Sequence, residues 1–295
     1  MISGILFGLG AATSQSLSYL FSRSFLSKHG SSLELMIIAH MIMALYSIVT
    51  LLFIPSWDIP PVSKFALPML LCSLSYVLGQ FAFFMAIKHA EASRISPLLG
   101  LKIIVIAILS VSFFSGDLSI VQWLAVSLCL CGALLSNWSG GSMPLPGILW
   151  LLFACLGYSL SDIYIRFTVD ALGRQHLIVS SITATALVYI FCGLLALPFL
   201  LFVSKGTIKK VKPAFPFATA WYGAMLLLFC CFATIGPVYG NIVQATRGII
   251  SILIGTILAH IGYAHLETKV STSTLIRRII AALMIMGAII IFSRG

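Results

Sequence analysis

The stretch GILFGLGAATSQSLSYLFSR (4–23) returns 143 positions later as GILWLLFACLGYSLSDIYIR (147–166). Both stretches begin with Gly-Ile-Leu, carry Ser-Leu-Ser twelve positions after that start, and end in an Arg seven positions further on. The residues between these matches are mostly apolar, and each stretch is long enough for a membrane-spanning helix of roughly 17–25 residues. The chain therefore contains two predicted membrane spans that share the same sequence pattern.

Two more matches follow in the same order. Ala92-Ser93-Arg94 resembles Ala245-Thr246-Arg247, and CGALLS (131–136) resembles MGAIIIFS (286–293). Short matches arise by chance in apolar sequence, but an ordered series with compatible offsets indicates an internal duplication. We expect one repeat over residues 1–138 and a second over 147–295.

The composition predicts that both repeats lie in lipid. Apolar residues make up 60% of the 295 residues and charged residues only 8%, far below the roughly 25% that is typical of soluble domains. We predict an all-α polytopic membrane protein, with five spans in each repeat and turn residues between them. The ten predicted helices are 2–22, 33–55, 66–87, 95–115, 118–137, 147–168, 177–202, 216–235, 238–263 and 275–293.

Five is an odd number, so the second repeat must enter the membrane upside down relative to the first. Such inverted repeats are typical of secondary transporters, in which two oppositely oriented units open a shared site to either side. The first residues, MISGILFGLG, lack a basic segment and are read as the start of the first span rather than a cleaved signal peptide.

Several other function classes are disfavoured. The net charge of +10 comes mainly from Lys and Arg at the ends of apolar runs, so no nucleic-acid surface is expected. The seven cysteines have no metal-finger spacing. The sequence has no HExxH motif, nucleophile–base pair or phosphate-binding glycine loop. His260, His265 and Glu267 are not expected to form a metal site. We therefore predict no enzyme activity, no metal and no cofactor.

The second part of each repeat resembles a known family. In residues 86–137 a span opens near Ser96-Pro97, an acidic turn follows at Gly116-Asp117, and the last span ends in CGALLS. This pattern is similar to an EamA repeat of the drug/metabolite transporter superfamily. Residues 246–291 follow the same outline, with Ser251 and Glu267 at the corresponding places. The chain departs from the family in its Asp117-Leu118 turn and in having His40 where the second span often carries an Arg.

The resemblance implies a ten-span transporter of the cell (inner) membrane with both termini in the cytoplasm. The loop charges point the other way. Loops after the odd-numbered spans hold 11 Lys and Arg residues and the opposite side holds 4, which by the positive-inside rule would place both termini outside. We keep the family orientation as the expectation.

Four polar residues from different helices lie within about 5–8 Å of the centres of their predicted spans, at 1.5 Å per residue. They are His40, Lys102, Asp162 and Arg247. Charged groups at this depth are expensive and usually face a bundle interior or cavity. For Lys102 the alternative is snorkelling to the nearer surface, and we prefer a cavity-facing role that holds an anionic group or pairs with Asp162.

Asp162 is the acidic residue that lies well inside a span. It either pairs with Arg166 one turn away on the same helix, or acts as a protonatable carboxylate or amine ligand, and the sequence favours neither. For His40 an interhelical hydrogen bond is preferred to a relay role, although it remains a coupling candidate beside Asp162. Arg247 shares a helix face with Gln244 and lies near Asn241, a face that either lines the cavity or joins the halves.

An aromatic and hydroxyl wall is also expected. Tyr76 and Gln80 belong to a stripe at three-to-four spacing in the third span, together with Ser73 and Phe83. Such a wall binds amines by cation–π contact and apolar solutes by packing. Its further candidates are Tyr19, Tyr158, Trp221, Tyr222 and Tyr239. For Trp221 and Tyr222, near a predicted helix start, the interfacial aromatic belt is the preferred interpretation.

The expected substrate-binding set is therefore Tyr76, Gln80, Lys102, Tyr158, Asp162, Asn241, Gln244 and Arg247. This set predicts a secondary transporter that moves a small polar or zwitterionic, amino-acid-like metabolite by alternating access. The alternatives are an exporter of cationic drugs or quaternary amines, and a non-transporting accessory or scaffold subunit. The expected partners are the small-molecule substrate and the lipid bilayer, with proton or exchange coupling, in a monomer or homodimer.

Overall fold

The computed structural model describes residues 1–29, 32–54, 59–87, 99–136, 144–173, 176–202, 207–250, 253–254 and 272–295. Within these ranges all regular secondary structure is helical. Ser96, Pro97, Ser251 and Glu267, which carry part of the family resemblance, lie outside the described residues, as do His260 and His265. The α-helices are α1 (Ile2–His29), α2 (Ser32–Leu52), α3 (Val62–Ile87), α5 (Lys102–Phe113), α6 (Ile120–Ser136), α7 (Leu145–Leu172), α8 (Leu177–Ala196), α9 (Val211–Ile235), α10 (Pro237–Gln244) and α12 (Thr272–Arg294).

Most of these helices begin and end close to the predicted spans. Five segments of the described chain are long and apolar enough to cross a membrane. Three shorter apolar helical segments accompany them, at Leu99–Phe113, Ile120–Leu135 and Ile279–Arg294. Since length and apolarity qualify five segments, the polytopic membrane fold is supported, while the number of ten spans stays a prediction. The five segments are Ser32–Leu52, Val62–Phe83, Leu145–Leu172, Leu177–Leu201 and Val211–Ile235.

The predicted continuous ninth span, 238–263, is wrong in the part that the structure describes. The helix α10 ends at Gln244, residues 245–246 form a turn, and helical geometry resumes over 247–250. The Thr246 amide bonds the Val243 carbonyl at 3.1 Å, and the Thr246 hydroxyl donates to the same oxygen at 2.7 Å. A threonine hydroxyl that competes for a nearby carbonyl in this way disturbs regular α-helical bonding.

The predicted fourth span, 95–115, is also shorter where it is described. A 3-10 turn, Leu99–Leu101, precedes α5, which begins at Lys102 and ends at Phe113. Ser115 has φ 53°, and the Gly116 amide returns to the Ser110 carbonyl at 2.9 Å, which closes the helix end. Lys102 therefore lies at the first residue of α5, near the start and not the centre of the helical segment that is described here.

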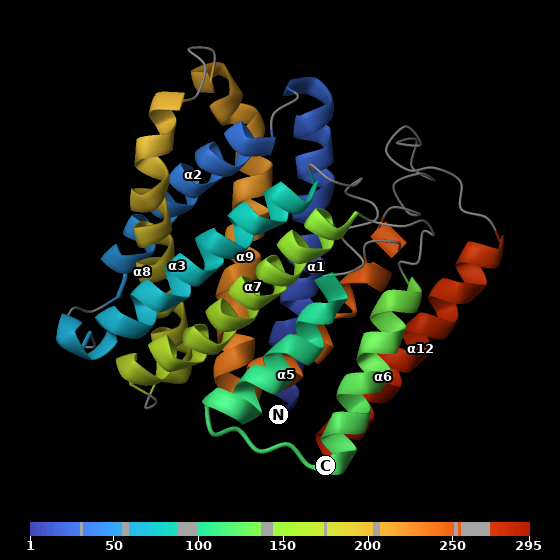
Figure 1. The fold of residues 1–295 in the computed structure, drawn as a ribbon. Coiled ribbons are helices and arrows are strands. Elements are labelled where there is room, and N and C mark those ends of the chain that lie inside the picture. The colour runs from blue at the N-terminus through green and yellow to red at the C-terminus, as the bar shows by residue number, and fades with distance from the viewer. Residues whose placement is uncertain are drawn as a thin grey trace.

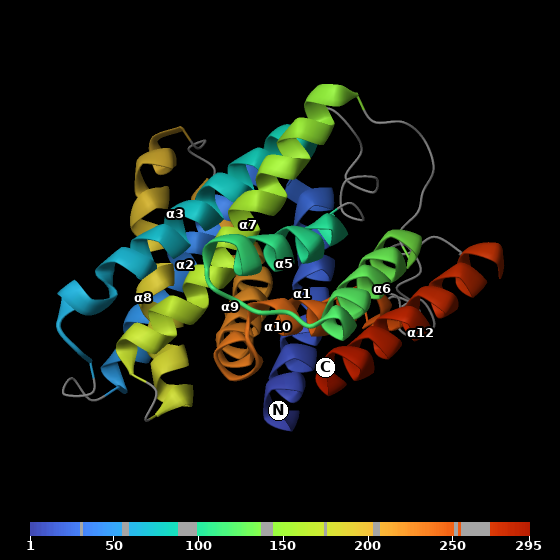
Figure 2. The same cartoon turned by 60° about the horizontal axis from the view of Figure 1, so that its bottom comes forward.

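The helices pack in a crossed pattern (Figures 1 and 2). α1 lies against α9, α3 against α7, α2 against α8, and α6 against α12. Both chain termini lie at the same end of the molecule in both views. An even number of membrane crossings places the two termini on one side in this way.

Buried side chains divide into two main cores. The larger core contains residues of α1, α2, α3, α7, α8 and α9, including Phe25, Phe229 and Phe232. The second contains residues of α5, α6, α10 and α12, including Val126, Ile242 and Ile285. In Figure 1 the pair α6 and α12 lies to one side of the larger group. The helices α5, α7 and α10, which carry Lys102, Asp162 and Asn241, lie where these two groups meet, whereas α2, which carries His40, packs within the larger group.

The helices α3 and α7 approach each other closely within the larger core. A Cβ atom placed on Gly157 would lie 2.8 Å from both the Cα and the amide nitrogen of Gly79. Backbone atoms cannot move aside as a flexible side chain can, so Gly157 requires glycine at this crossing, while a Cβ on Gly79 would lie 3.0–3.1 Å from Tyr158. The outer faces are apolar instead, with Leu6, Leu78 and Leu283 each more than 60% exposed, which fits a surface covered by lipid.

Candidate functional site

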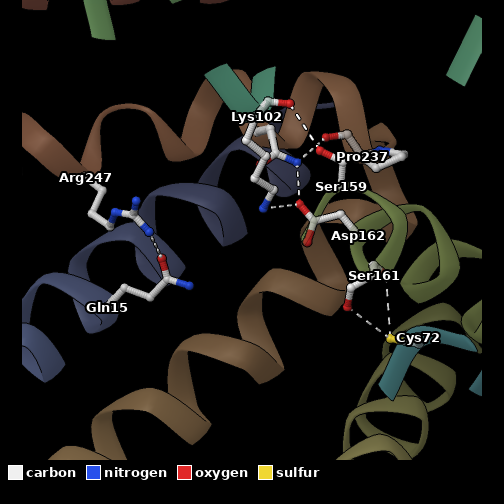
Figure 3. A network of polar contacts seen from close by, with 9 residues as sticks. Gln15, Cys72, Lys102, Ser159, Ser161, Asp162, Pro237 and Arg247 are labelled. Atoms are coloured by element: carbon white, nitrogen blue, oxygen red, sulfur yellow. Dashed lines mark hydrogen bonds and ion pairs between the residues drawn. The ribbon is translucent and has the colours of Figure 1, made fainter. Parts of the chain in front are cut away.

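The site that we consider first is an ion pair between the two helix groups. The Lys102 ammonium lies 2.5 Å from Oδ2 of Asp162, and Nδ2 of Asn241 donates to the same oxygen at 2.7 Å. The side chains of Lys102 and Asp162 are 21% and 8% exposed. Figure 3 shows Lys102 and Asp162 facing each other from different helices. Of the two predicted partners of Asp162, the structure thus selects Lys102.

Each member of this pair is held by its own helix. Asp162 lies in the buried face of α7, and Lys102 opens α5, where the Ser159 hydroxyl donates to the Lys102 carbonyl at 3.4 Å. The Asn241 amide also donates to the Pro237 carbonyl at 2.8 Å, which fixes its side chain against the first turn of α10. The hydrogen bond and the ion pair of Asp162 both fall on Oδ2, so Oδ1 takes part in neither of these two interactions.

The Asp162–Arg166 pair, the other partner considered for Asp162, is not formed. Nε of Arg166 donates to the Asp170 carboxylate at 3.2 Å. The guanidinium also donates to the carbonyls of Phe232 and Ala233 at the end of α9. A helix end leaves its last carbonyls without intrahelical donors, and Gly236 turns the chain there with φ 80°. Arg166 is therefore a cap for α9, which leaves Asp162 to Lys102.

A second polar cluster surrounds Arg247. Nη1 of Arg247 donates to Oε1 of Gln15 at 2.9 Å (Figure 3), and its guanidinium carbon lies 5.4 Å from the ring centre of Tyr19. The Ser16 hydroxyl donates to the Arg247 carbonyl at 3.2 Å. All three partners lie on α1, and Gln15 is 4% exposed. Arg247 thus joins α1 to the segment after α10. This contact is compatible with both predicted roles of its helix face, cavity lining and a joint between the halves.

The two clusters use matching positions of the duplicated stretch. Lys102 contacts α7 through the ring of Tyr158, at 5.9 Å from its centre, and through Ser159 and Asp162. Arg247 contacts α1 through Gln15, Ser16 and Tyr19. Each of these α1 residues precedes its α7 counterpart by 143 positions, the same offset that relates the two Gly-Ile-Leu starts.

Aromatic side chains of four helices meet beside the ion pair. Tyr76 lies 6.3 Å from Tyr158 and 6.2 Å from Tyr189 between ring centres, and Nε2 of Gln80 donates to the Tyr76 hydroxyl at 3.1 Å. Trp221 donates its indole N–H to the Tyr189 hydroxyl at 3.0 Å. Tyr76, Gln80 and Tyr158 thus lie together as expected, and Tyr189 is an additional member that we did not predict. Its sequence signal was a single tyrosine in the second half of a helix that otherwise consists of aliphatic and small residues and Phe191.

Three expectations about aromatic residues are wrong. Trp221 and Tyr222 do not belong to an interfacial belt, because Trp221 packs edge-on against Tyr19 at 6.1 Å and Tyr222 is 5% exposed, with its hydroxyl 3.1 Å from that of Thr50. Tyr239 does not join the wall. It stacks on Phe292 at 4.9 Å and donates to the Ile289 carbonyl in the second core.

His40 faces the aromatic cluster without the interhelical hydrogen bond that we preferred for it. Its Nδ1 lies 2.8 Å from the Met36 carbonyl one turn earlier, so this nitrogen is the donor and the bond stays within α2. Nε2 is buried and has no hydrogen-bond partner among the described residues, and the centre of the imidazole ring lies 5.8 Å from that of Tyr76 and 6.3 Å from that of Tyr189. Gln244 lies apart from this cluster, with Nε2 donating to the Gly8 carbonyl at 3.5 Å.

No group of three His, Cys, Asp or Glu side chains that could hold a metal is found in the described ranges. The seven cysteines are free, and six of them are buried. Chemically, the site offers a cation paired with a carboxylate, a second cation with neutral partners, and tyrosine hydroxyls. These groups can bind and orient charged solutes.

Comparisons with known proteins agree with this architecture. Residues 2–138 match the EamA-like transporter family. A stretch of 54 residues is 41% identical to an uncharacterized transporter in the cobO 3' region of a Sinorhizobium species, and it covers 18% of this chain and 38% of that relative. A solved structure described only as "Crystal structure of protein" has the same fold, with a TM-score of 0.69 at 17% identity over 99% of this chain and 96% of the other.

Proposed function

We propose that this chain, whose residues 2–138 match the EamA-like transporter family, is a secondary transporter of a small zwitterionic metabolite of the amino-acid kind. The observation that carries the proposal is the Lys102–Asp162 pair with Asn241, because it places both signs of charge at the border between two helix groups. Polar groups at such a border are typical of substrate and ion pathways. The Asp162 carboxylate, through Oδ1, and the nearby tyrosines offer a site for an ammonium group.

We further propose that residues 1–138 and 147–295 form two inverted five-helix repeats. The packing pattern supports this division. Exchanging each helix of the first repeat with its counterpart in the second turns the α1–α9 contact into the α3–α7 contact, and maps the α2–α8 and α6–α12 pairs onto themselves. A pseudo-two-fold axis produces such a pattern, and inverted repeats related by one are common in transporters.

The motion that we propose separates the two helix groups. Lys102 and Asn241 belong to helices of the smaller core and Asp162 to the larger one, so the ion pair crosses the border. Substrate charges that engage Asp162 would replace contacts between the groups and let them rock to open the site on the other side. Proton or exchange coupling would then provide the driving force, with Asp162 and His40 as the candidate groups.

The location that we propose is the inner membrane, with both termini in the cytoplasm. A reporter that is active only outside the cytoplasm, fused after Gly295, should therefore stay silent. The basic loop residues around Lys209 and Lys212 would face the other side under this proposal. Activity of the fused reporter would reverse the orientation and support the loop charges instead.

The transport proposal is tested with purified protein in proteoliposomes and radiolabelled amino acids. We expect Lys102→Ala and Asp162→Asn each to lower uptake at least about tenfold, because each leaves a partner charge without compensation. The exposed Arg294→Gln serves as a matched loss of charge outside the site. Uptake that both site variants leave unchanged would show that this is not the substrate site.

A cationic substrate is a second candidate, favoured by the tyrosine cluster beside Asp162. Aromatic rings attract quaternary ammonium groups by cation–π contact. In the same proteoliposomes, uptake of a tetraalkylammonium ion without uptake of amino acids would select this candidate. The scaffold alternative predicts polar residues paired across helices, which Lys102–Asp162 and Arg247–Gln15 also satisfy. The family match favours transport, and the absence of uptake for both substrate classes would favour the scaffold.

A further inference from the structure

Arg247 and Lys102 occupy equivalent places in the two clusters. Each opens a helical segment, Lys102 after a 3-10 turn and Arg247 after the turn at 245–246. The carbonyl of each accepts a hydrogen bond from a serine of the duplicated stretch, Ser159 for Lys102 and Ser16 for Arg247. Each side chain then reaches the two positions that flank this serine on the same helix face.

The two clusters differ in charge. The residue three positions after the serine is Asp162 in the Lys102 cluster and Tyr19 in the Arg247 cluster, so Lys102 meets a carboxylate while Arg247 meets a ring. The remaining partner of Arg247 is the amide of Gln15, which is neutral. Among the described residues, Lys102 is therefore compensated and Arg247 is not.

We propose that Arg247, and not Lys102, binds the anionic group of the substrate, a carboxylate. A partly buried cation among neutral groups attracts an anion more strongly than one that already has a counter-ion. The guanidinium has five N–H donors in a planar fork, and Gln15 accepts from Nη1 alone. The fork can hold a carboxylate through two parallel bonds. Lys102 is then a positioning residue that orients the Asp162 carboxylate.

This assignment rests on the proposed function and defines which cation reads the carboxylate of a zwitterion. The competing explanation is that Arg247 only joins α1 to the segment after α10. That explanation predicts a loss of stability when Arg247 is replaced, but no saturable binding of carboxylates that depends on its charge. Binding to purified protein therefore separates the two explanations without a transport measurement.

Trp221 provides the signal. It packs edge-on against Tyr19 at 6.1 Å, and Tyr19 lies under the Arg247 guanidinium. A carboxylate that engages Arg247 should change the environment of Tyr19 and, through it, the fluorescence of Trp221. The probes are acetate and 4-methylpentanoate, with isoamylamine as the amine of matching size. Trp221→Phe identifies the part of the signal that belongs to this tryptophan, since the chain has five.

We expect both carboxylates to change the fluorescence of Trp221 in a saturable way. Isoamylamine should compete with them weakly or not at all. Arg247→Gln should weaken carboxylate binding by about tenfold or more, the usual loss when a charge-assisted pair is removed. Arg247→Lys should restore part of it. Lys102→Gln and the control Arg294→Gln should leave 4-methylpentanoate binding within about threefold of the wild type, because this probe has no ammonium for Asp162.

Binding that is lost in Lys102→Gln but kept in Arg247→Gln would overturn the assignment. So would the absence of any saturable response in the wild type. If carboxylate binding depends on Arg247 but no amino acid is taken up by proteoliposomes, the transport proposal fails and the assignment stands. If uptake occurs without binding that depends on Arg247, the assignment alone fails.

Discussion

The Lys102–Asp162 pair should show strong energetic coupling in a double-mutant cycle. Asp162 is 8% exposed at its side chain and accepts from two donors on one oxygen. Replacing Lys102 by Met leaves this carboxylate with the Asn241 amide alone. Removing one partner of a buried pair typically costs 3–5 kcal/mol, and we expect about 3 kcal/mol here because Lys102 is 21% exposed and Asn241 remains.

The reverse change should cost less. Asp162→Asn leaves a lysine whose side chain still reaches solvent, so we expect a loss of about 1–2 kcal/mol. Combining Lys102→Met with Asp162→Asn removes both charges and should bring the free energy of unfolding within about 1 kcal/mol of the wild type. The sum of the two single losses would therefore exceed the loss of the double change by about 3–5 kcal/mol.

The assay is unfolding of the purified protein in mixed detergent micelles by titration with sodium dodecyl sulfate. Lys64, which is exposed at the start of α3, provides the control, and Lys64→Met should change the free energy of unfolding by no more than about 0.5 kcal/mol. Single effects that add within about 0.5 kcal/mol would mean that the two groups do not interact. That result would refute the pairing on which the site is built.

The remaining predictions use the same unfolding assay. Gly157→Ala should destabilise the protein by at least about 2 kcal/mol, because the added Cβ would meet the backbone of Gly79 at 2.8 Å. Gly223→Ala meets nothing within 4 Å and should instead stabilise by up to about 1 kcal/mol, so equal effects of the two changes would contradict the packing. Arg166→Gln should lower the free energy of unfolding by about 1.5–3 kcal/mol, because it removes the cap of α9. It should also speed amide hydrogen exchange near Ala233. Unchanged exchange there would argue against the cap.

The approximate helix positions could be predicted because they depend on local pattern, and the duplication that we propose rests on local pattern as well. Apolar runs of spanning length and recurring Gly-Ile-Leu and Ser-Leu-Ser motifs are properties of short segments. The break at 245–246 could not be predicted in this way, because an isolated threonine is common inside membrane helices and only its hydrogen bonds reveal the turn.

The partners of the polar residues depended on tertiary packing. Arg166 lies one helical turn from both Asp162 and Asp170, so spacing alone could not choose between them. The choice followed from the end of α9, whose free carbonyls hold the guanidinium toward Asp170. Tyr189 and Gln15 were missed for a similar reason, since a lone polar residue in a span does not show which neighbour it will meet.

The contacts that cross between the two helix groups fit the opening of the border that we propose. A wholly apolar border would be held by close packing that no small solute could replace. A buried ion pair contributes little net stability, because its attraction is largely offset by the cost of removing two charges from water. A zwitterion that brings its own ammonium and carboxylate can therefore take over the contacts of Asp162 and Arg247 at small net cost. If the two groups separated around an apolar solute of equal size, Asp162 would lose Lys102 and Arg247 would lose Gln15 without any replacement. Such a solute should therefore not be carried. For this reason we expect that a neutral alcohol about the size of isobutane will neither bind nor compete with amino-acid uptake. Competition by such an alcohol in the proteoliposome assay would contradict this account.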